Sequence, residues 1–363
     1  MVDDAVSGGT RVPVILSFIY PSSHHRTGGV IVLYELANGL ARRGHKVHFV
    51  HGPSNPYRIH SLDELPPFRF DDAIEHHIVD SLDDPRLPAG DVVFYADAPR
   101  RLGLPVGIVQ GYRMLAEDVE LALFRAPVPK ACVASWLVDV GLRYGAPPEQ
   151  LWYVPLGIDH RVFTFRKPSN ERHYDVAMLS HPHREKGFAV GVEALTELQR
   201  RVRNLRALVF GMDPLSRPLP DGVEFWQAPD HPTLADRIYN ECRVFLQPSF
   251  HEGFGYTAVE AMACGCALVT TDNGGARDYA LHDETAQVVP PGDSTGLAHA
   301  VVQLLHDDTR RARLADAGAR LVRRRFDWDN TASVLDAHLQ MYLADPGRYQ
   351  AAPADAVAPE GAG

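Results

Sequence analysis

Two carboxylates lie close together in the segment HEGFGYTAVEAMACG (251–265), where Glu252 and Glu260 are eight positions apart. The apolar run VFLQPS (244–249) just before them predicts a buried strand of a parallel sheet. From about Tyr256 the apolar residues take helical spacing, so Glu252 precedes a predicted helix and Glu260 lies inside it. Ligands of open α/β sheets bind at this kind of position, beyond the carboxyl end of a strand.

The glycines of the same segment indicate an anion site at the start of the helix. Gly253 and Gly255 allow unusual backbone dihedrals and a close approach to a ligand. A helix N-terminus presents unpaired N–H groups that bind anions. Here those groups would be the amides of Phe254, Gly255, Tyr256 and Thr257.

An anion flanked by two acids suggests a ligand that carries polar groups on both sides of a phosphate. A nucleoside diphosphate sugar has this layout. Glu252 would accept hydrogen bonds from sugar hydroxyls, Glu260 would hold the ribose diol, and the diphosphate would lie between them.

With its Glu-x7-Glu spacing, this segment resembles the donor-site signature of retaining, GT-B-fold glycosyltransferases of family 4. The resemblance extends over nearly the whole chain and keeps the family's order. It rests on TGGVIVLYELANGLARRGHKV near the N-terminus, YVPLGID, MLSHPHREKGF, and CALVTTDNGGARDYALHDETAQVVPPGD after the two acids. It implies transfer of a hexose-type sugar from a nucleotide-sugar donor to an acceptor hydroxyl on a glycan, a lipid or a small-molecule natural product.

The resemblance also implies which residues meet the donor. Lys186 of the KG element and the Gly28–Gly29 loop would contact the diphosphate, because lysine supplies a point charge and glycine permits close approach. A surface lysine and an ordinary strand-to-helix turn are the competing interpretations. Glu252 and Lys186 are the predicted catalytic residues.

The sequence departs from the family pattern at two places. Leu179–Ser180 stands where many members carry Gly-Arg, so Arg184 is the predicted substitute, with His181 or His183 as a neutral helper. Gln110 stands where many members carry a histidine near the reacting carbon. An amide hydrogen-bonds a hydroxyl but carries no proton, so a general base at that position is in doubt, whereas assistance by the departing phosphate needs none.

Two successive strand–helix alternations predict an α/β protein with two Rossmann-like domains facing each other across a cleft. We expect an acceptor-binding domain over 1–160, a donor-binding domain over 161–330, and a linker within 152–175. The resemblance adds a C-terminal helix, 331–346, that crosses back to the first domain, and the Ala/Pro/Gly-rich end, 349–363, is predicted to be disordered.

Composition narrows the function classes. The net charge of −10 argues against nucleic acid as a partner. No apolar run reaches the roughly 18 residues of a membrane span, although peripheral membrane contact stays open. The acidic start is not a signal peptide, and four scattered cysteines are typical of a reducing cytoplasm, so we expect a cytoplasmic protein.

No metal or other cofactor is expected. Asp327 and Asp329 of DWD resemble a metal-binding Asp-x-Asp, but their place before a helix favours capping. Cys264 and Cys266 are interpreted as buried small residues, and His24–His25 and His181/His183 as polar lining. Without G-x-G-x-x-G after the first strand, a dehydrogenase is disfavoured. A sugar-nucleotide epimerase and a non-catalytic nucleotide-sugar binder remain the alternatives.

Overall fold

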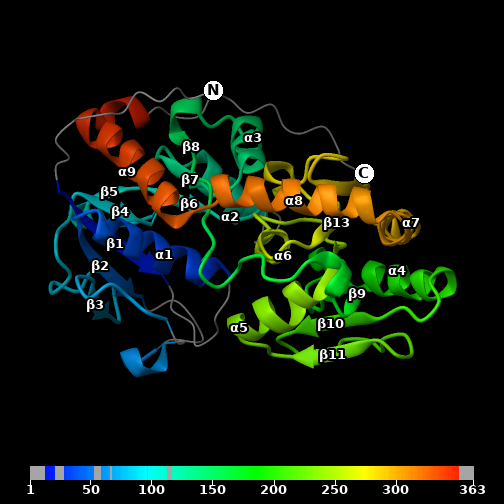
Figure 1. Ribbon diagram of the computed structural model, residues 1–363. Helices are drawn as coiled ribbons and strands as arrows, with labels where there is room; N and C mark the ends of the chain where they lie inside the picture. The colour runs from blue at the N-terminus through cyan, green and yellow to red at the C-terminus, as the bar shows by residue number, and fades with distance from the viewer. Residues whose placement is uncertain are drawn as a thin grey trace.

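The computed structural model describes residues 13–20, 28–52, 59–65, 68–95, 97–112 and 117–350. Figure 1 shows two α/β lobes side by side, with the chain passing from one to the other and returning through its last helices. The predicted histidine pair His24–His25 and residues 351–363 of the predicted tail lie outside the described residues.

The first lobe contains two parallel sheets that adjoin at Val106. The five-stranded sheet has the order β3(Glu75–Ile78), β2(Lys46–His51), β1(Ile15–Tyr20), β4(Val92–Phe94), β5(Leu104–Pro105). The three-stranded sheet has the order β6(Gly107–Val109), β7(Lys130–Cys132), β8(Leu151–Tyr153). Only Val106 separates β5 from β6, so the chain passes directly from the five-stranded sheet into the three-stranded sheet. Together the two sheets give the succession of parallel strands that is typical of a doubly wound fold.

The second lobe is a six-stranded, all-parallel sheet. Its order is β11(Glu224–Gln227), β10(Ala207–Gly211), β9(Tyr174–Leu179), β12(Cys242–Gln247), β13(Ala267–Thr271), β14(Ala286–Val289). The apolar residues of β12 and β13 are buried, as the apolar runs predict, and Arg243 near the start of β12 is half-buried. The predicted α/β class with two Rossmann-like domains is confirmed.

Nine α-helices connect and cover these sheets within the described residues. They are α1(Gly28–Arg42), α2(Glu117–Arg125), α3(Ser135–Arg143), α4(Phe188–Arg201), α5(His231–Thr233), α6(Tyr256–Ala263), α7(Ser294–His306), α8(Asp308–Arg325) and α9(Trp328–Ala344). Asp327 caps α9 by accepting hydrogen bonds from the amides of Asp329 and Asn330. The capping interpretation of DWD is therefore confirmed.

The last helix crosses back to the first lobe, as predicted (Figure 1). It packs on α1 so closely that a Cβ added at Gly39 would meet the Ala332 Cβ at 2.7 Å. The buried Asp336 carboxylate accepts from Arg43 at 3.0 Å and lies 3.1 Å from His45. This helix begins at Trp328, a few residues before the predicted bound.

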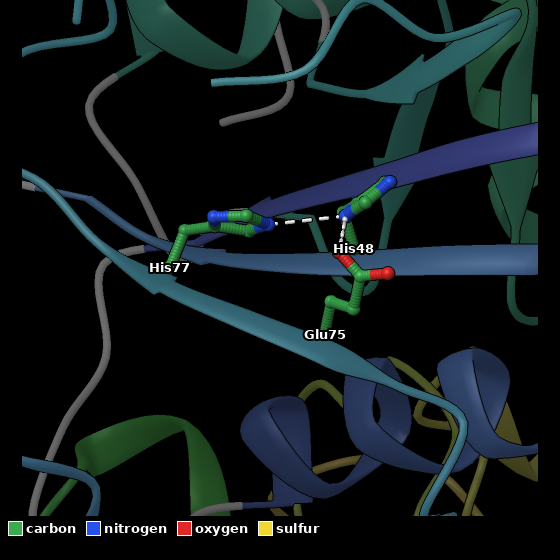
Figure 2. Close-up of side chains that lie close together, drawn as sticks. All are labelled: His48, Glu75 and His77. Carbon is green, nitrogen blue, oxygen red and sulfur yellow. Dashed lines mark hydrogen bonds and ion pairs between the residues drawn. The ribbon is translucent and has the colours of Figure 1, made fainter. Parts of the chain in front are cut away.

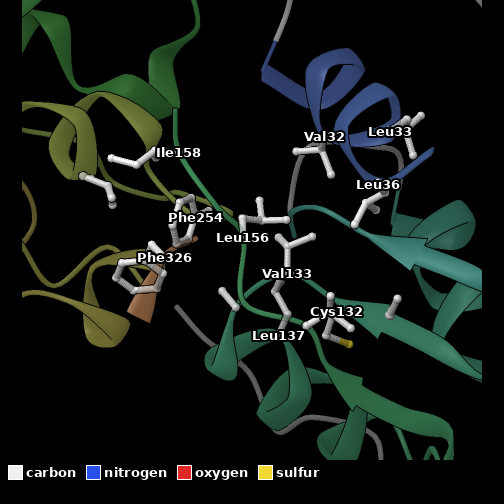
Figure 3. Packing of buried hydrophobic residues seen from close by; sticks show 14 of the residues in the cluster. Val32, Leu33, Leu36, Cys132, Val133, Leu137, Leu156, Ile158, Phe254 and Phe326 are labelled. Carbon is white, nitrogen blue, oxygen red and sulfur yellow. The ribbon is translucent and has the colours of Figure 1, made fainter. Parts of the chain in front are cut away.

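The hydrophobic core is continuous between the lobes. Figure 3 shows Val133 and Leu137 of the first lobe, Leu156 and Ile158 of the connecting segment, and Phe254 of the second gathered in one cluster. Because both lobes share this cluster, their relative placement is fixed by apolar burial as well as by the covalent connection.

Two boundaries differ from prediction. Trp152 and Tyr153 belong to β8 and Tyr174 begins β9, so the linker is shorter than 152–175. Tyr349 is 4% exposed and its carbonyl accepts a hydrogen bond from Gln150, so the predicted tail does not begin at residue 349. Tyr349 makes aromatic contacts with the last helix and with β8. The Ala/Pro-rich composition that follows Tyr349 gave no indication of these contacts.

Arg172, in the segment that joins the lobes, anchors the helix carrying Glu260. Its guanidinium is 1% exposed and donates to the carbonyls of Cys242 at 2.7 Å and Cys264 at 2.6 Å. Cys264 is the C-terminal cap residue of α6. A buried cation at a helix C-terminus is favourable because the terminal carbonyls carry partial negative charge, so this contact fixes α6 in place.

Candidate functional site

Glu252 lies in the loop between β12 and α6, and its backbone is fixed by a neighbouring loop. The Glu252 amide donates to the Asn273 carbonyl at 2.9 Å, and the Gly275 amide donates to the Glu252 carbonyl at 3.1 Å. The sequence NGG (273–275), which supplies these groups, follows β13 in the same way that Glu252 follows β12. Adjacent parallel strands thus bring their two following loops together.

Two polar side chains hold the Glu252 carboxylate, and Glu252 is 6% exposed. Lys186 Nζ lies 2.6 Å from Oε2, and Ser249 Oγ donates to Oε1 at 2.8 Å. A largely buried carboxylate held by a cation and a hydroxyl has its position and charge fixed in advance. The structure therefore brings together Lys186 and Glu252, the two predicted catalytic residues.

Lys186 ends a single 3₁₀ turn, Arg184–Lys186, that packs against the Glu252 loop. The Phe250 amide donates to the Glu185 carbonyl at 2.7 Å, and His251 Nδ1 lies 2.6 Å from Glu185 Oε2. Gly187 follows with φ +65°, and a Cβ there would lie 2.0 Å from the Pro248 carbonyl oxygen. Only glycine fits this left-handed, tightly packed position.

The first lobe meets this loop at the residues that the sequence singled out. A Cβ on Gly253 would lie 1.9 Å from the Gln110 carbonyl oxygen, and one on Gly29 would lie 3.2 Å from Gln110 Oε1. A Cβ on Gly28 would lie 3.5 Å from the Tyr256 ring. Gly28, Gly29, Gln110, Gly253 and Tyr256, predicted from three separate motifs, therefore converge between the lobes.

The helix start at Tyr256 is also as predicted. Gly255, at φ +96°, is the N-cap residue of α6 and provides no side-chain cap. The adjacent Phe254 side chain is 4% exposed and packs on Phe326 and Tyr279. Phe254 can therefore offer a ligand its backbone only. An anion site at the α6 N-terminus remains a prediction.

Glu260 is inside α6 and 9% exposed. The Tyr239 hydroxyl donates to its Oε2 at 3.2 Å. Burial, with Glu260 as a nearby negative charge, raises the pKa of Tyr239 well above its usual value, so this hydroxyl keeps its proton. The contact with ribose remains a prediction.

The remaining predicted residues differ in burial and charge. Arg184 is exposed, Thr257 is half-buried, and His183 is exposed. Burial, together with Lys186 and His183, lowers the pKa of His181, so its imidazole is neutral near pH 7, as expected for a neutral helper. Cys264 and Cys266 are buried free thiols, as predicted.

A pocket of about 370 Å³ opens between the lobes beside this loop. Phe250, His251, Asn273 and Gly274 line it from the second lobe, and Tyr112, Trp136 and Arg143 from the first. Sequence reasoning missed Trp136, whose indole N–H donates to the Gly253 carbonyl at 2.8 Å. Its position directly after the run ACVAS was the available signal.

A larger groove of about 780 Å³ lies elsewhere, where β9 and β12 begin. Charged residues including Lys167, Arg206 and Arg243 line it. Open α/β sheets bind ligands at the carboxyl ends of their strands. We therefore place the candidate site at the Glu252 loop rather than in this groove.

The two lobes and the site between them define a GT-B fold. Solved structures show the same fold over most of the chain. A glycosyltransferase from Rickettsia africae has a TM-score of 0.70 at 16% identity, covering 92% of this chain and 99% of that one. HepE of Anabaena, in complex with UDP and glucose, has a TM-score of 0.70 at 17% identity, covering 90% and 100%.

Sequence comparison points to the same class of protein. Residues 160–321 match the family described as "Glycosyl transferases group 1". A D-inositol 3-phosphate glycosyltransferase of Xylanimonas cellulosilytica is 34% identical over 266 residues, covering 65% of this chain and 62% of that protein. A 2-deoxystreptamine N-acetyl-D-glucosaminyltransferase of Niallia circulans is 28% identical over 142 residues, covering 37% and 36%. The chain thus spans less than two thirds of these relatives' length.

Proposed function

We propose that this protein is a retaining glycosyltransferase, which transfers a sugar from a nucleoside-diphosphate donor to an acceptor hydroxyl. The observation that carries the proposal is the Lys186–Glu252 pair, which lies beside the α6 N-terminus where the two lobes meet. The family matched by residues 160–321, which include both Lys186 and Glu252, supports the same reaction class.

In this proposal the diphosphate binds the α6 amides, with Lys186, Arg184 and the Gly28–Gly29 backbone around it. Charge developing on the departing phosphate is stabilised by these preorganised donors. The Glu260 carboxylate accepts hydrogen bonds from the ribose hydroxyls. Glu252 faces the transferred sugar, where its negative charge stabilises positive charge that develops at the anomeric carbon.

The position of Gln110 is relevant to the anomeric configuration of the transferred sugar. Its carbonyl oxygen is at the Gly253 contact and its side-chain oxygen faces Gly29, so it lies within the site but carries no transferable proton. This favours a mechanism in which the departing phosphate itself assists the acceptor hydroxyl and the anomeric configuration is retained. It disfavours an epimerase, which needs acid and base groups at the reacting carbon.

The deciding experiment mixes the full chain with UDP- and GDP-sugars and a panel of acceptors, followed by mass spectrometry. Inositol phosphates and aminocyclitols belong in the panel because relatives are named for such acceptors. A glycosylated acceptor with the donor's anomeric configuration, assigned by NMR, supports the proposal. Donor isomerisation without transfer identifies an epimerase, and donor binding without turnover identifies a binder.

Metal independence is part of the proposal. Lys186, Arg184 and the helix N-terminus supply the positive charge that a divalent ion would otherwise provide, so turnover should persist in excess EDTA. Loss of turnover on chelation, with recovery on adding manganese or magnesium, would refute this part.

We place the reaction in the cytoplasm, consistent with four cysteines that form no disulfide. None of the described helices has the length and apolarity that crossing a bilayer requires.

A further inference from the structure

A cluster of two histidines and a glutamate lies on the first lobe, at the sheet edge opposite β6. His48 is on β2, and Glu75 and His77 are on the edge strand β3. In the strand register His48 is paired with Glu75 and Val50 with His77. Because side chains alternate along a strand, these three project from one face of the sheet, whereas His51 and His76 project from the other.

The ligand atoms of the three side chains converge. Figure 2 shows His48 facing both His77 and Glu75, with His48 Nδ1 lying 3.0 Å from His77 Nε2 and 3.4 Å from Glu75 Oε2. Two nitrogens bound to one tetrahedral zinc ion at ~2.05 Å are separated by ~3.3 Å. Both separations from His48 are within a few tenths of an ångström of this value, and all three ligand atoms lie within 4.8 Å of one another.

From this geometry we propose that His48, Glu75 and His77 form a binding site for a divalent transition-metal ion such as Zn²⁺. Among the described residues, this is the one group of three or more potential ligands that meets within 4.8 Å. Two imidazoles and a carboxylate are a recognised zinc ligand set, with a fourth position left for water. The His48 ring is 2% exposed, whereas Glu75 is 53% exposed, so an ion would reach the cluster from the Glu75 side.

A hydrogen bond between the two imidazoles is the competing explanation of the short N···N distance. The molecule contains a matched case on the other face of the same strands, where His51 Nε2 lies 3.0 Å from His76 Nδ1. That pair belongs to no three-ligand group among the described residues. Comparing the two pairs therefore separates metal binding from imidazole pairing.

The ion would connect the edge strand β3 to β2. An edge strand is hydrogen-bonded on one side only, and here it carries polar residues rather than an apolar run. A metal bond across the two strands would hold β3 in register. Because β3 is the edge of the five-stranded sheet that lies away from β5, and Gln110 follows β6 beyond β5, we assign the ion a structural role, separate from the proposed reaction.

The test uses the tag-free full chain, freed of metal by chelation and dialysis. Zn²⁺ is titrated in competition with a chromophoric chelator, and Co²⁺ is used as a spectroscopic probe. We expect about one ion per chain, a tetrahedral Co²⁺ absorption band, and a higher Tm with Zn²⁺. Because removing ligand-supporting groups alone costs 10- to 100-fold, His77→Gln and Glu75→Gln should each weaken Zn²⁺ at least ~10-fold.

Three controls make the result decisive. His76→Gln, on the opposite face, and the double variant His24→Ala/His25→Ala should bind Zn²⁺ as the wild type does. Lys46, whose Nζ lies 3.2 Å from Glu75 Oε1, adds a positive charge beside the site, so Lys46→Gln should not weaken binding. No saturable Zn²⁺ binding, or equal binding by wild type and His77→Gln, would overturn the proposal. Since Glu75 is exposed, Glu75→Gln provides a variant that keeps the fold.

Discussion

At the scale of single residues, the proposed chemistry depends most on Glu252. We expect Glu252→Gln to lower turnover by ~10²-fold or more, because it removes one preorganised negative charge beside the reacting carbon. Binding of the bare nucleoside diphosphate should hardly change. Steady-state kinetics and calorimetry with the diphosphate give the two quantities.

Ser249 provides the control for this prediction. If Glu252 only braces its loop, Glu252→Gln should reduce nucleotide affinity and Tm together while turnover at saturating donor stays near normal. Ser249→Ala removes the hydroxyl that donates to the Glu252 carboxylate and leaves the negative charge of the carboxylate in place. It should therefore affect turnover much less than Glu252→Gln.

Glu260 gives a complementary prediction at the same scale. Glu260→Ala should weaken binding of the bare nucleoside diphosphate by roughly 1.5–3 kcal/mol, since a charge-assisted ribose contact is made with or without the sugar. Isothermal titration with the diphosphate measures this. Tyr239→Phe removes the hydroxyl that Glu260 accepts from and keeps the carboxylate, so it should retain most of the affinity. Wild-type affinity in Glu260→Ala would remove Glu260 from the site.

At the scale of elements, the packing of α9 on β8 makes stability depend on pH. His338 of α9 stacks on Trp152 with ring centroids 5.1 Å apart, and its Nδ1 is buried with no hydrogen-bond partner among the described residues. Burial lowers the pKa of His338 from 6.5 to about 4. Between these values the unfolded chain binds the proton and the folded chain does not.

Acidification should therefore lower the free energy of unfolding. The contribution of neutral, buried His338 to that free energy is fully retained above pH 6.5 and is lost as pH falls from 6.5 through about 4. The free energy of unfolding that is lost in this way reaches at most about 3 kcal/mol once the pH is below the folded-state pKa. Urea denaturation across this range should show His338→Phe losing less stability on acidification than the wild type. An identical pH dependence in both proteins would contradict the prediction.

At the scale of the whole molecule, Gly253 controls how closely the lobes approach. A side chain there would collide with the Gln110 backbone in the other lobe, at 1.9 Å. Gly253→Ala should therefore separate the two halves of the site and lower turnover on the order of 10²-fold, the cost of a displacement of about 1 Å. Small-angle scattering should show a larger radius of gyration.

Gly347→Ala is the matched control, because a Cβ there would make only an ordinary contact at 3.6 Å. Its turnover and scattering should match those of the wild type. Should Gly253→Ala keep full turnover, the lobe contact at Gln110 would have no part in the reaction.

The amino-acid sequence by itself determined most of the elements and the local shape of the site. Continuous apolar runs identified the buried strands, because a strand covered on both faces has no polar positions. The glycines before Tyr256 and the helical spacing after it located the α6 start, because positive φ is a property of single positions. The edge strands β3, β8 and β11 were missed. In β3 and β11, Glu75, His76 and Gln227 interrupt the apolar pattern.

Only the tertiary structure decided which of these residues meet. Lys186 and Glu252 are 66 positions apart, and Gly253 touches Gln110 from the other lobe. The same is true of the His48–Glu75–His77 cluster, which arises from the register of β2 on β3. Chain spacing encodes neighbours within one helix or strand, whereas contacts between elements depend on how their faces pack. Distant residues of opposite charge or matching shape are therefore paired by the fold, and local pattern does not reveal the pairing.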